Sequence, residues 1–236
     1  MPIFPTRISN VAEYIRRHGL AAAVAEIRDR LADAYWERRL GVRTEGMVTK
    51  ANLDVSEADS IDYVPMRYRA VFSVLRMLPG DRSNDVFVDF GCGKGRVVVV
   101  AATFPFKAVI GVELSRALAA VARDNVERMK RRAARSIEIV CANASEFAIP
   151  LDASVLYFFN PFRGETLRQV LSNTRRSIEL HPRTVSIVFF NNDLFEDLVD
   201  GQPWIRRRFD ASSFHGYSCG VYLASPTAGQ ASAAES

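Results

Sequence analysis

One stretch of this 236-residue chain, Val86 to Arg96, constrains its fold more than any other. Its letters are VFVDFGCGKGR, a short apolar run followed by glycines at alternate positions and the start of another apolar run. A strand that passes through a glycine turn into a helix typically opens a parallel α/β sheet, whose ligands lie at the carboxyl ends of the strands. Glycine lets the backbone adopt positive φ and approach a ligand closely. We therefore expect a ligand site directly after residue 90.

The chain beyond this turn alternates between strand-like and helix-like patterns. The expected strands are 86–90, 108–112, 137–141, 155–159 and 185–190, and the expected helices are 96–103, 116–132 and 165–180. Alternation of this kind predicts right-handed crossovers and a mainly parallel sheet covered on both faces. Residues 204–209 and 217–224 are two strand-like stretches with no full helix between them, which predicts an antiparallel hairpin at one sheet edge. The predicted fold class is thus α/β and Rossmann-like.

The first 65 residues follow a different pattern. Apolar residues recur at helical spacing from 8 to 40, with a break at Gly19, which predicts two helices that pack on the main domain as a lid or brace. The second helix has the apolar stripe Leu20, Val24, Ile27, Leu31 and Tyr35. Residues 41–60 predict a long ordered loop and 66–78 a further helix. We expect three regions, namely helices and a lid loop (1–65), the main domain (66–225) and a disordered tail (226–236).

Composition narrows the class of protein. The chain has 48% hydrophobic and 25% charged residues, a net charge of +4 and a pI near 9.1. This mild basicity falls short of a dedicated nucleic-acid binder, so a nucleic-acid partner is not expected, although it is not excluded. The three cysteines have no metal-binding spacing, and no apolar run reaches the roughly 18 residues of a membrane span. We expect a cytoplasmic protein without a metal site.

The glycine pattern and the strand ends narrow the ligand. A dinucleotide fingerprint, G-x-G-x-x-G, would need glycine at position 96, where this chain has arginine, so NAD and FAD are disfavoured. Asp89 and Glu113 end consecutive strands, and a carboxylate at the second place can accept hydrogen bonds from both ribose hydroxyls. The third strand leads to Asn143, whose amide can accept from and donate to an adenine edge. A turn-forming role for Asn143 is the alternative.

Residues 89–95, DFGCGKG, resemble the D-x-G-x-G-x-G motif of the class I S-adenosylmethionine (SAM) dependent methyltransferases, and residues 86–190 are similar to the general pattern of that superfamily. The resemblance implies SAM as the cofactor and a Rossmann-like class I methyltransferase sheet. It also implies cofactor contacts from Asp89, Gly91, Cys92, Gly93, Gly95, Glu113, Leu114, Asn143, Ala144 and Asn160.

Two further motifs resemble parts of methyltransferases. Asn160-Pro161-Phe162 is similar to a shortened N-P-P-Y/F loop of amino-group methyltransferases, which implies catalytic roles for Asn160 on a nitrogen and Phe162 on a planar acceptor. A core position is the alternative for Phe162. The layout around Tyr63-x-Pro65 resembles a group of uncharacterised bacterial methyltransferases and the Dot1-like and ATP-synthase c-subunit-type lysine methyltransferases. That layout implies that Tyr63 and Pro65 close over the cofactor.

Three functions fit these motifs. The leading one is SAM-dependent N-methylation of a protein lysine or a small amine. The second is O-methylation of a small metabolite, which needs a general base, for which His215 is the best candidate. The third is a noncatalytic SAM-binding or RNA-associated module. The sequence leaves open the acceptor's identity, the choice between nitrogen and oxygen, the oligomeric state and whether the N-terminal helices form a lid or a partner interface.

Overall fold

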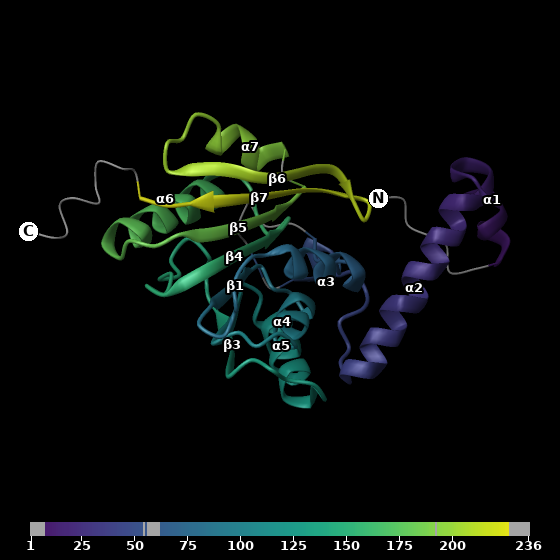
Figure 1. The fold of residues 1–236 in the computed structure, drawn as a ribbon. Coiled ribbons are helices and arrows are strands. Elements are labelled where there is room, and N and C mark those ends of the chain that lie inside the picture. The colour runs from purple at the N-terminus through teal and green to yellow at the C-terminus, as the bar shows by residue number, and fades with distance from the viewer. Residues whose placement is uncertain (1–7, 54, 56–61, 192, 227–236) are drawn as a thin grey trace, which may run out of the picture.

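The computed structural model describes residues 8–53, 55, 62–191 and 193–226. Within them, one seven-stranded sheet has the order β3-β2-β1-β4-β5-β7-β6 (Figure 1). The strands are β1 (Val86–Phe90), β2 (Ala108–Glu113), β3 (Ser136–Cys141), β4 (Ala153–Phe159), β5 (Val185–Phe190), β6 (Ile205–Phe214) and β7 (Tyr217–Ala224). The helices are α1 (Ile8–His18), α2 (Leu20–Leu40), the short 3-10 helix η1 (Lys50–Asn52), α3 (Tyr68–Met77), α4 (Arg96–Ala101), α5 (Arg116–Arg128), α6 (Gly164–Leu180) and α7 (Asp193–Val199).

The strand order places the ligand crevice. Strands β1 to β5 run parallel, and β7 pairs antiparallel with both β5 and β6, so the predicted hairpin does form one edge of the sheet. From β1 the chain moves outward through β2 to β3, and it then returns to β4 on the other side of β1. The order reverses between β1 and β4, and a crevice opens at the carboxyl ends of strands at such a reversal.

Both faces of the sheet are buried because alternate residues of its strands enter two separate cores. Phe87 of β1 packs into the core shared with α3, α4 and α5, whereas its neighbours Val86 and Val88 pack into the core under α6 and α7. Figure 1 shows these two groups of helices on opposite sides of the sheet. Strands that are buried on both faces have continuous apolar sequences, which is why the short strands were legible.

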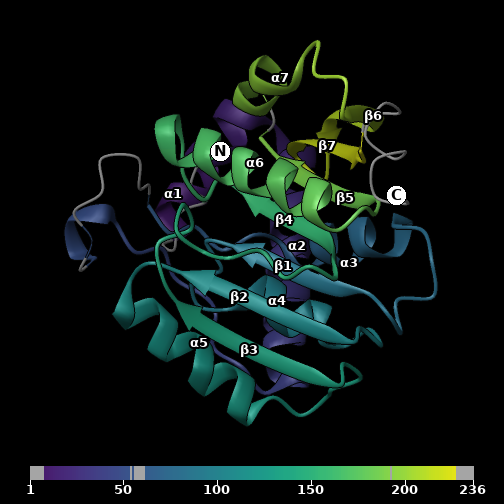
Figure 2. The ribbon, with the colours of Figure 1, turned by 90° about the vertical axis from the view of Figure 1, so that its left-hand side faces the viewer.

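The two N-terminal helices form as predicted, but α2 does not dock through its apolar stripe. Leu20 and Leu31 are 66% and 67% exposed, and Figure 2, seen from another side, likewise places α1 at the margin of the fold. The opposite, polar face of α2 contacts the domain instead. Asp33 is 2% exposed, and its carboxylate accepts hydrogen bonds from Arg67 Nη1 (2.8 Å) and the Tyr68 amide (3.0 Å). The expectation that apolar packing would hold this helix was wrong, because buried charge pairs do so.

Several boundaries also differ from expectation. Helix α7 was not predicted, because its seven residues are too few to display a period and the two described side chains that reach the core are Phe195 and Val199. Strand β6 extends to Phe214 through two register shifts, and α5 ends at Arg128 rather than residue 132. The predicted tail from 227 onward and most of loop residues 54–61 lie outside the described residues. None of the described helices combines the length and apolar character needed to span a membrane.

The attachment of α2 generates a stability prediction. Asp33→Ala leaves the partly buried Arg67 without one of its two carboxylate partners, and removing one partner of a buried ion pair costs about 3–5 kcal/mol. Asp152→Ala removes the half-exposed partner of Lys107 and should cost less than about 1 kcal/mol. Urea denaturation of both variants measures the difference, and equal losses would show that α2 is not held by this buried carboxylate.

Candidate active site

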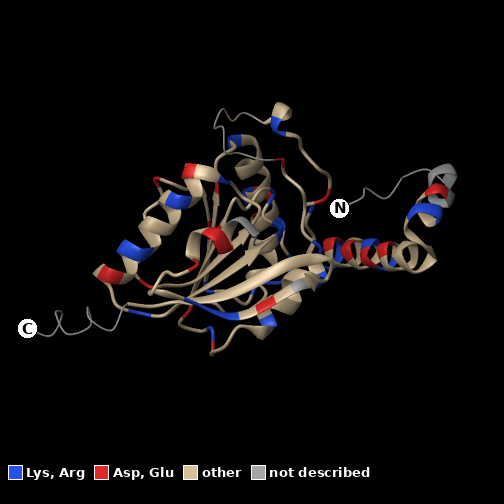
Figure 3. Cartoon of the chain, turned by 90° about the horizontal axis from the view of Figure 1, so that it is seen from above, with Lys and Arg blue, Asp and Glu red and all other residues tan. Residues whose placement is uncertain are grey.

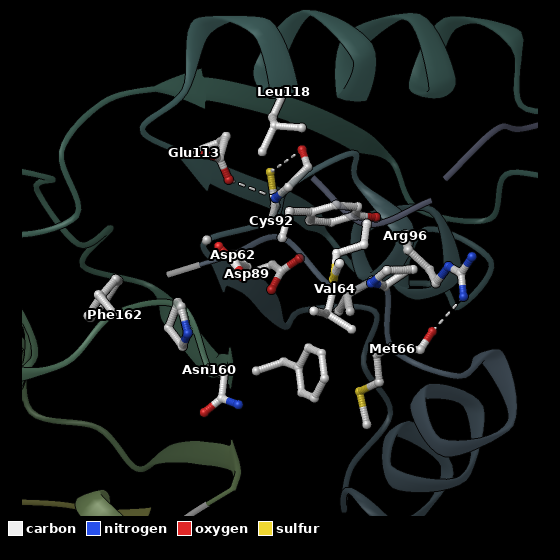
Figure 4. Close-up of a pocket in the computed structure, with 18 of the residues that line it drawn as sticks. Asp62, Val64, Met66, Asp89, Cys92, Arg96, Glu113, Leu118, Asn160 and Phe162 are labelled. Carbon is white, nitrogen blue, oxygen red and sulfur yellow. Dashed lines mark hydrogen bonds between the residues drawn. The ribbon is translucent and has the colours of Figure 1, made fainter. Parts of the chain in front are cut away.

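A cavity of about 910 Å³ lies at the carboxyl ends of the central strands. Figure 4 shows Asp89, Glu113 and Asn160 around this space. Most of the residues expected at the site line it, namely Tyr63, Pro65, Asp89, Gly91, Cys92, Gly93, Glu113, Leu114, Asn143, Ala144, Asn160 and Phe162. The strand-end positions therefore converge, as parallel strands with a common carboxyl edge require.

The glycine turn has no room for side chains. Gly91 has φ of +72°, and a Cβ there would collide with the Pro161 ring of the loop after β4. Gly93 has φ of +55°, and a Cβ there would collide with the ring of Tyr63. Both glycines thus permit close approaches as well as left-handed backbone. The turn brings the chain before β1 and the chain after β4 together at one end of the cavity.

Asp89 has the most unusual environment in the cavity. It is 2% exposed, and among the residues that the structure describes its Oδ2 has no hydrogen-bond partner. Burial raises the pKa of this carboxyl well above its ordinary value, and the neighbouring Glu113 carboxylate raises it further. A buried acceptor without a partner is costly and is rarely retained without a function. The position suits a ligand with a cationic donor group, which would supply the missing hydrogen bond.

Glu113 is held rigidly at the end of β2. Its Oε2 accepts from the Gly93 amide (2.8 Å) and its Oε1 from the Ser115 amide (2.9 Å). Each carboxylate oxygen can accept more than one hydrogen bond, so both retain capacity for ligand hydroxyls. The Ser115 hydroxyl caps α5 by accepting from the Leu118 amide, which fixes the turn that follows. Glu113 is therefore positioned before any ligand arrives.

The residues after β3 and β2 form the other end of the cavity. Leu114 and Leu118 offer apolar surface there, and Asn143 and Ala144 line the same end. The Asn143 Oδ1 accepts from both the amide (3.0 Å) and the hydroxyl (2.8 Å) of Ser145. The turn-forming role considered for Asn143 is thus present. An apolar slot edged by an amide is suitable for a flat heterocycle.

Two asparagines end the neighbouring strands β4 and β5. Asn160 has φ of +44° and Asn191 has φ of +56°, and both line the cavity. Non-glycine residues with positive φ are uncommon and gather at functional sites. Asn191 was not expected at the site, and the only local signal was its place directly after β5. The walls beside them are the rings of Phe159 and Tyr217.

Phe162 is a core residue that also reaches the cavity wall. It is 8% exposed, and its ring packs edge-to-face on Phe90 (6.5 Å between centroids) and Phe158 (6.3 Å). A ring held by two others in this way has little freedom to stack on an acceptor. Its geometry matches the core alternative.

Two expected site residues do not line the cavity. Gly95 begins α4, and a Cβ there would lie 3.2 Å from that of Ala122, so this glycine serves helix packing. His215 lies at the β6–β7 turn, where its Nε2 is 3.0 Å from Ser73 Oγ. Partial burial, together with Arg69, lowers the pKa of His215. The structure therefore separates His215 from the other candidate residues.

Two stretches before β1, residues 42–53 and 62–67, lie over the glycine turn, and we call them the covering stretches. They pair with each other through backbone hydrogen bonds between Val48 and Tyr63. The Tyr63 hydroxyl donates to the Thr44 carbonyl (2.8 Å), and Lys94 of the turn donates to the carbonyls of Glu45 (2.6 Å) and Gly46 (2.9 Å). Tyr63 and Pro65 are thus held against the cavity, as their predicted place requires.

Arg96 secures the covering stretches, and sequence reasoning missed it. Its guanidinium donates to Thr44 Oγ1 (2.7 Å), the Met66 carbonyl (2.7 Å) and Glu45 Oε1 (2.5 Å). These partners lie 30 to 52 positions away in sequence, so no local pattern could have indicated them. Within the described residues no group of three or more His, Cys, Asp or Glu is arranged to hold a metal ion.

Comparisons with known proteins agree with this geometry. Residues 87–180 match the family model described as a methyltransferase domain. A protein from Haemophilus influenzae that is assigned as a methylase superposes with a TM-score of 0.51 at 14% identity, over 77% of this chain and 100% of that chain. An RNA methyltransferase from Salinibacter ruber in complex with S-adenosyl-L-homocysteine gives a TM-score of 0.46 at 21% identity, over 69% and 94%. No curated protein matches the chain with significance.

The family match spans the glycine turn, both acidic strand ends and the Asn160 loop, and the Haemophilus influenzae protein shares the fold along its whole length. The cavity meets the requirements of the cofactor that this family uses. Asp89 has an unsatisfied buried oxygen suited to an ammonium group, and Glu113 is placed for hydroxyls beside an apolar slot. The chain is therefore a class I S-adenosylmethionine-dependent methyltransferase.

Proposed function

We propose that this methyltransferase acts on nitrogen, in a protein lysine or a small amine. The observation that carries the proposal is the chemistry around Asn160. The described residues at that end of the cavity include two strand-end asparagines and two aromatic rings but no histidine. His215, the base that a hydroxyl acceptor would need, hydrogen-bonds to Ser73 outside the cavity. Amide oxygens accept hydrogen bonds from an amine and orient its lone pair without having to remove a proton from an alcohol.

The cofactor's binding residues are part of the same proposal. The Asp89 carboxylate holds the ammonium group of SAM, the Glu113 oxygens accept from the ribose hydroxyls, and Asn143 and Ala144 edge the adenine beside Leu114. The bound SAM supplies a methyl group on a sulfonium, which makes transfer an in-line displacement. The protein's own contribution is orientation, since a well-placed nucleophile saves much of the entropy cost of a bimolecular step.

The aromatic walls contribute to the state of the acceptor. Phe159 and Tyr217 replace water around the nitrogen, and desolvation lowers the pKa of an ammonium ion, which favours the neutral amine that can attack. Asn160 then accepts an N–H hydrogen bond and directs the remaining lone pair toward the methyl group. We also propose that residues 1–65, through the covering stretches, exclude water from a catalytic domain formed by residues 66–225.

The acceptor class is tested by incubating the protein with isotopically labelled SAM and a host extract that is afterwards separated into protein, nucleic-acid and small-molecule fractions. Label should enter protein or small amines and should resist mild base, as N-methyl groups do. Transfer into RNA, or into base-labile methyl esters, would contradict the proposal. The catalytically inactive control is the Asp89→Asn variant, which should label no fraction.

Asp89 gives a prediction about stability and affinity together. Its raised pKa means that the free folded protein holds a proton that the unfolded chain loses, so the stability of the free protein falls as pH rises from the unfolded pKa toward the folded one. Asp89→Asn removes this buried charge and should make the free protein more stable at neutral pH, by about 1 kcal/mol or more. The same variant should lose most of its SAM affinity. Thermal melts with and without SAM over a pH series measure both effects.

A variant that is less stable than the natural chain at pH 7, or that binds SAM equally well, would show that Asp89 is a structural residue. Glu113→Gln is the matched control, because this carboxylate already accepts backbone hydrogen bonds. That substitution should lower stability, since Glu113 accepts from two amides that an uncharged side chain satisfies less well.

The loop after β4 separates catalysis from packing. Asn160→Gly removes the amide without backbone strain, since φ is already positive, and should lower the rate of methyl transfer by roughly tenfold or more while SAM affinity changes little. Phe162→Ala should instead cost about 3–5 kcal/mol of stability, because its ring is buried between two others. Single-turnover rates and denaturation curves distinguish these outcomes. An unchanged rate in Asn160→Gly would remove the basis for its catalytic role.

A further inference from the structure

The outer side of α2 carries a stripe of large apolar side chains that the fold leaves in solvent. Its members are 44–67% exposed and are Leu20, Val24, Ile27, Leu31 and Tyr35. Figure 3 shows that α2 extends away from the sheet. Side chains of this size and exposure present on the order of 400 Å² of apolar surface, a patch size that on monomers is often functional. We call these five residues the seam.

The spacing of the seam indicates what kind of surface it fits. Leu20, Val24, Ile27 and Leu31 follow the 4-3-4 spacing of a heptad repeat, so they occupy a narrow line along one side of the helix. That is the geometry by which one helix receives the side chains of another. A helix that lies in a membrane surface has a wider apolar face, with its polar face in water. The polar face of α2 instead contacts its own domain through Glu26 and Asp33.

The charges beside the seam specify the partner. Arg28 has a side chain that is 59% exposed, and Arg38 and Arg39 are also exposed next to the seam. A parallel pair of α2 helices would place the two Arg38 side chains together, and an antiparallel pair centred on Ile27 would do so with Arg28. Like charges at these positions oppose pairing, whereas carboxylates on another helix would be attracted. A second copy of this chain therefore fits the seam poorly.

We propose that the seam is a docking site for an acidic amphipathic helix of a partner protein. Apolar residues of that helix pack between Val24, Ile27 and Leu31. Its glutamates or aspartates lie beside Arg28 and Arg38. The fold does not depend on the seam, because the opposite face of α2 secures the helix through buried carboxylates. The surface is thus available without rearrangement of the cavity.

The test uses the full chain and two synthetic three-heptad peptides with leucine at the core positions and either glutamate or lysine at the flanking positions. Fluorescence anisotropy should show that the acidic peptide binds at least about tenfold more tightly than the basic one. Leu31→Asp should weaken that binding about tenfold or more. Leu180→Asp is the matched control, since Leu180 is 68% exposed on α6, and it should leave binding unchanged. Arg28→Glu combined with Arg38→Glu should reverse the preference between peptides.

Equal binding of the two peptides, or full binding by Leu31→Asp, would overturn the proposal. It would also be overturned if sedimentation showed that the free chain dimerises through the seam, with the dimer lost in Leu31→Asp. Binding to phosphatidylglycerol vesicles that depends on Leu31 and exceeds peptide binding would instead assign the seam to a lipid surface. Unchanged melting temperature and SAM affinity in the seam variants establish that they are folded.

Discussion

The structure depends on one buried cation, the guanidinium of Arg96. Its side chain is 3% exposed at the start of α4, directly after the glycine turn. A buried guanidinium is tolerated only when its donors are paired, and the groups that pair them come from α2 and the covering stretches. The first turn of a helix is electrostatically unfavourable for a cation, so Glu37 and Glu45 also offset the helix dipole. Arg96 therefore connects the N-terminal region to the turn that carries the cofactor.

The parts of the fold that were predictable from sequence are those with local signals. Strands buried on both faces have short apolar sequences, and the turn at Gly91 and Gly93 has a composition that few structures other than a ligand loop require. Helix α2 was located correctly but its docking face was not, because apolar spacing at Leu20 and Leu31 indicates a helix without showing what covers it. Its attachment depends on charge pairs between residues more than 30 positions apart, such as Asp33 and Arg67, for which a single sequence gives no signal.

The same distinction applies to the site. Asp89, Glu113 and Asn160 were found because strand ends can be located once the strands are known, and parallel strands bring their ends together. Asn191 and Arg96 were missed because their roles arise from neighbours that only the folded chain supplies. Asn125 is a further example, since its amide donates to the carbonyls of Arg43 and Lys94 and so joins a covering stretch to the glycine turn. The unsatisfied oxygen of Asp89 indicates that this region gives up stability in the free protein in order to bind its cofactor.

The central claim is that Arg96 holds the covering stretches over the cavity, and hydrogen–deuterium exchange of Arg96→Met tests it most directly. The control is Arg183→Met, since Arg183 is a partly buried arginine that donates to Ala153 and Ser177 carbonyls away from the covering stretches. The account predicts faster exchange at residues 42–53 and 62–67 in Arg96→Met, unchanged protection of β1 and β4, and weakened SAM binding. The control should show none of these three effects. Unchanged exchange in the covering stretches, with SAM affinity intact, would contradict the account.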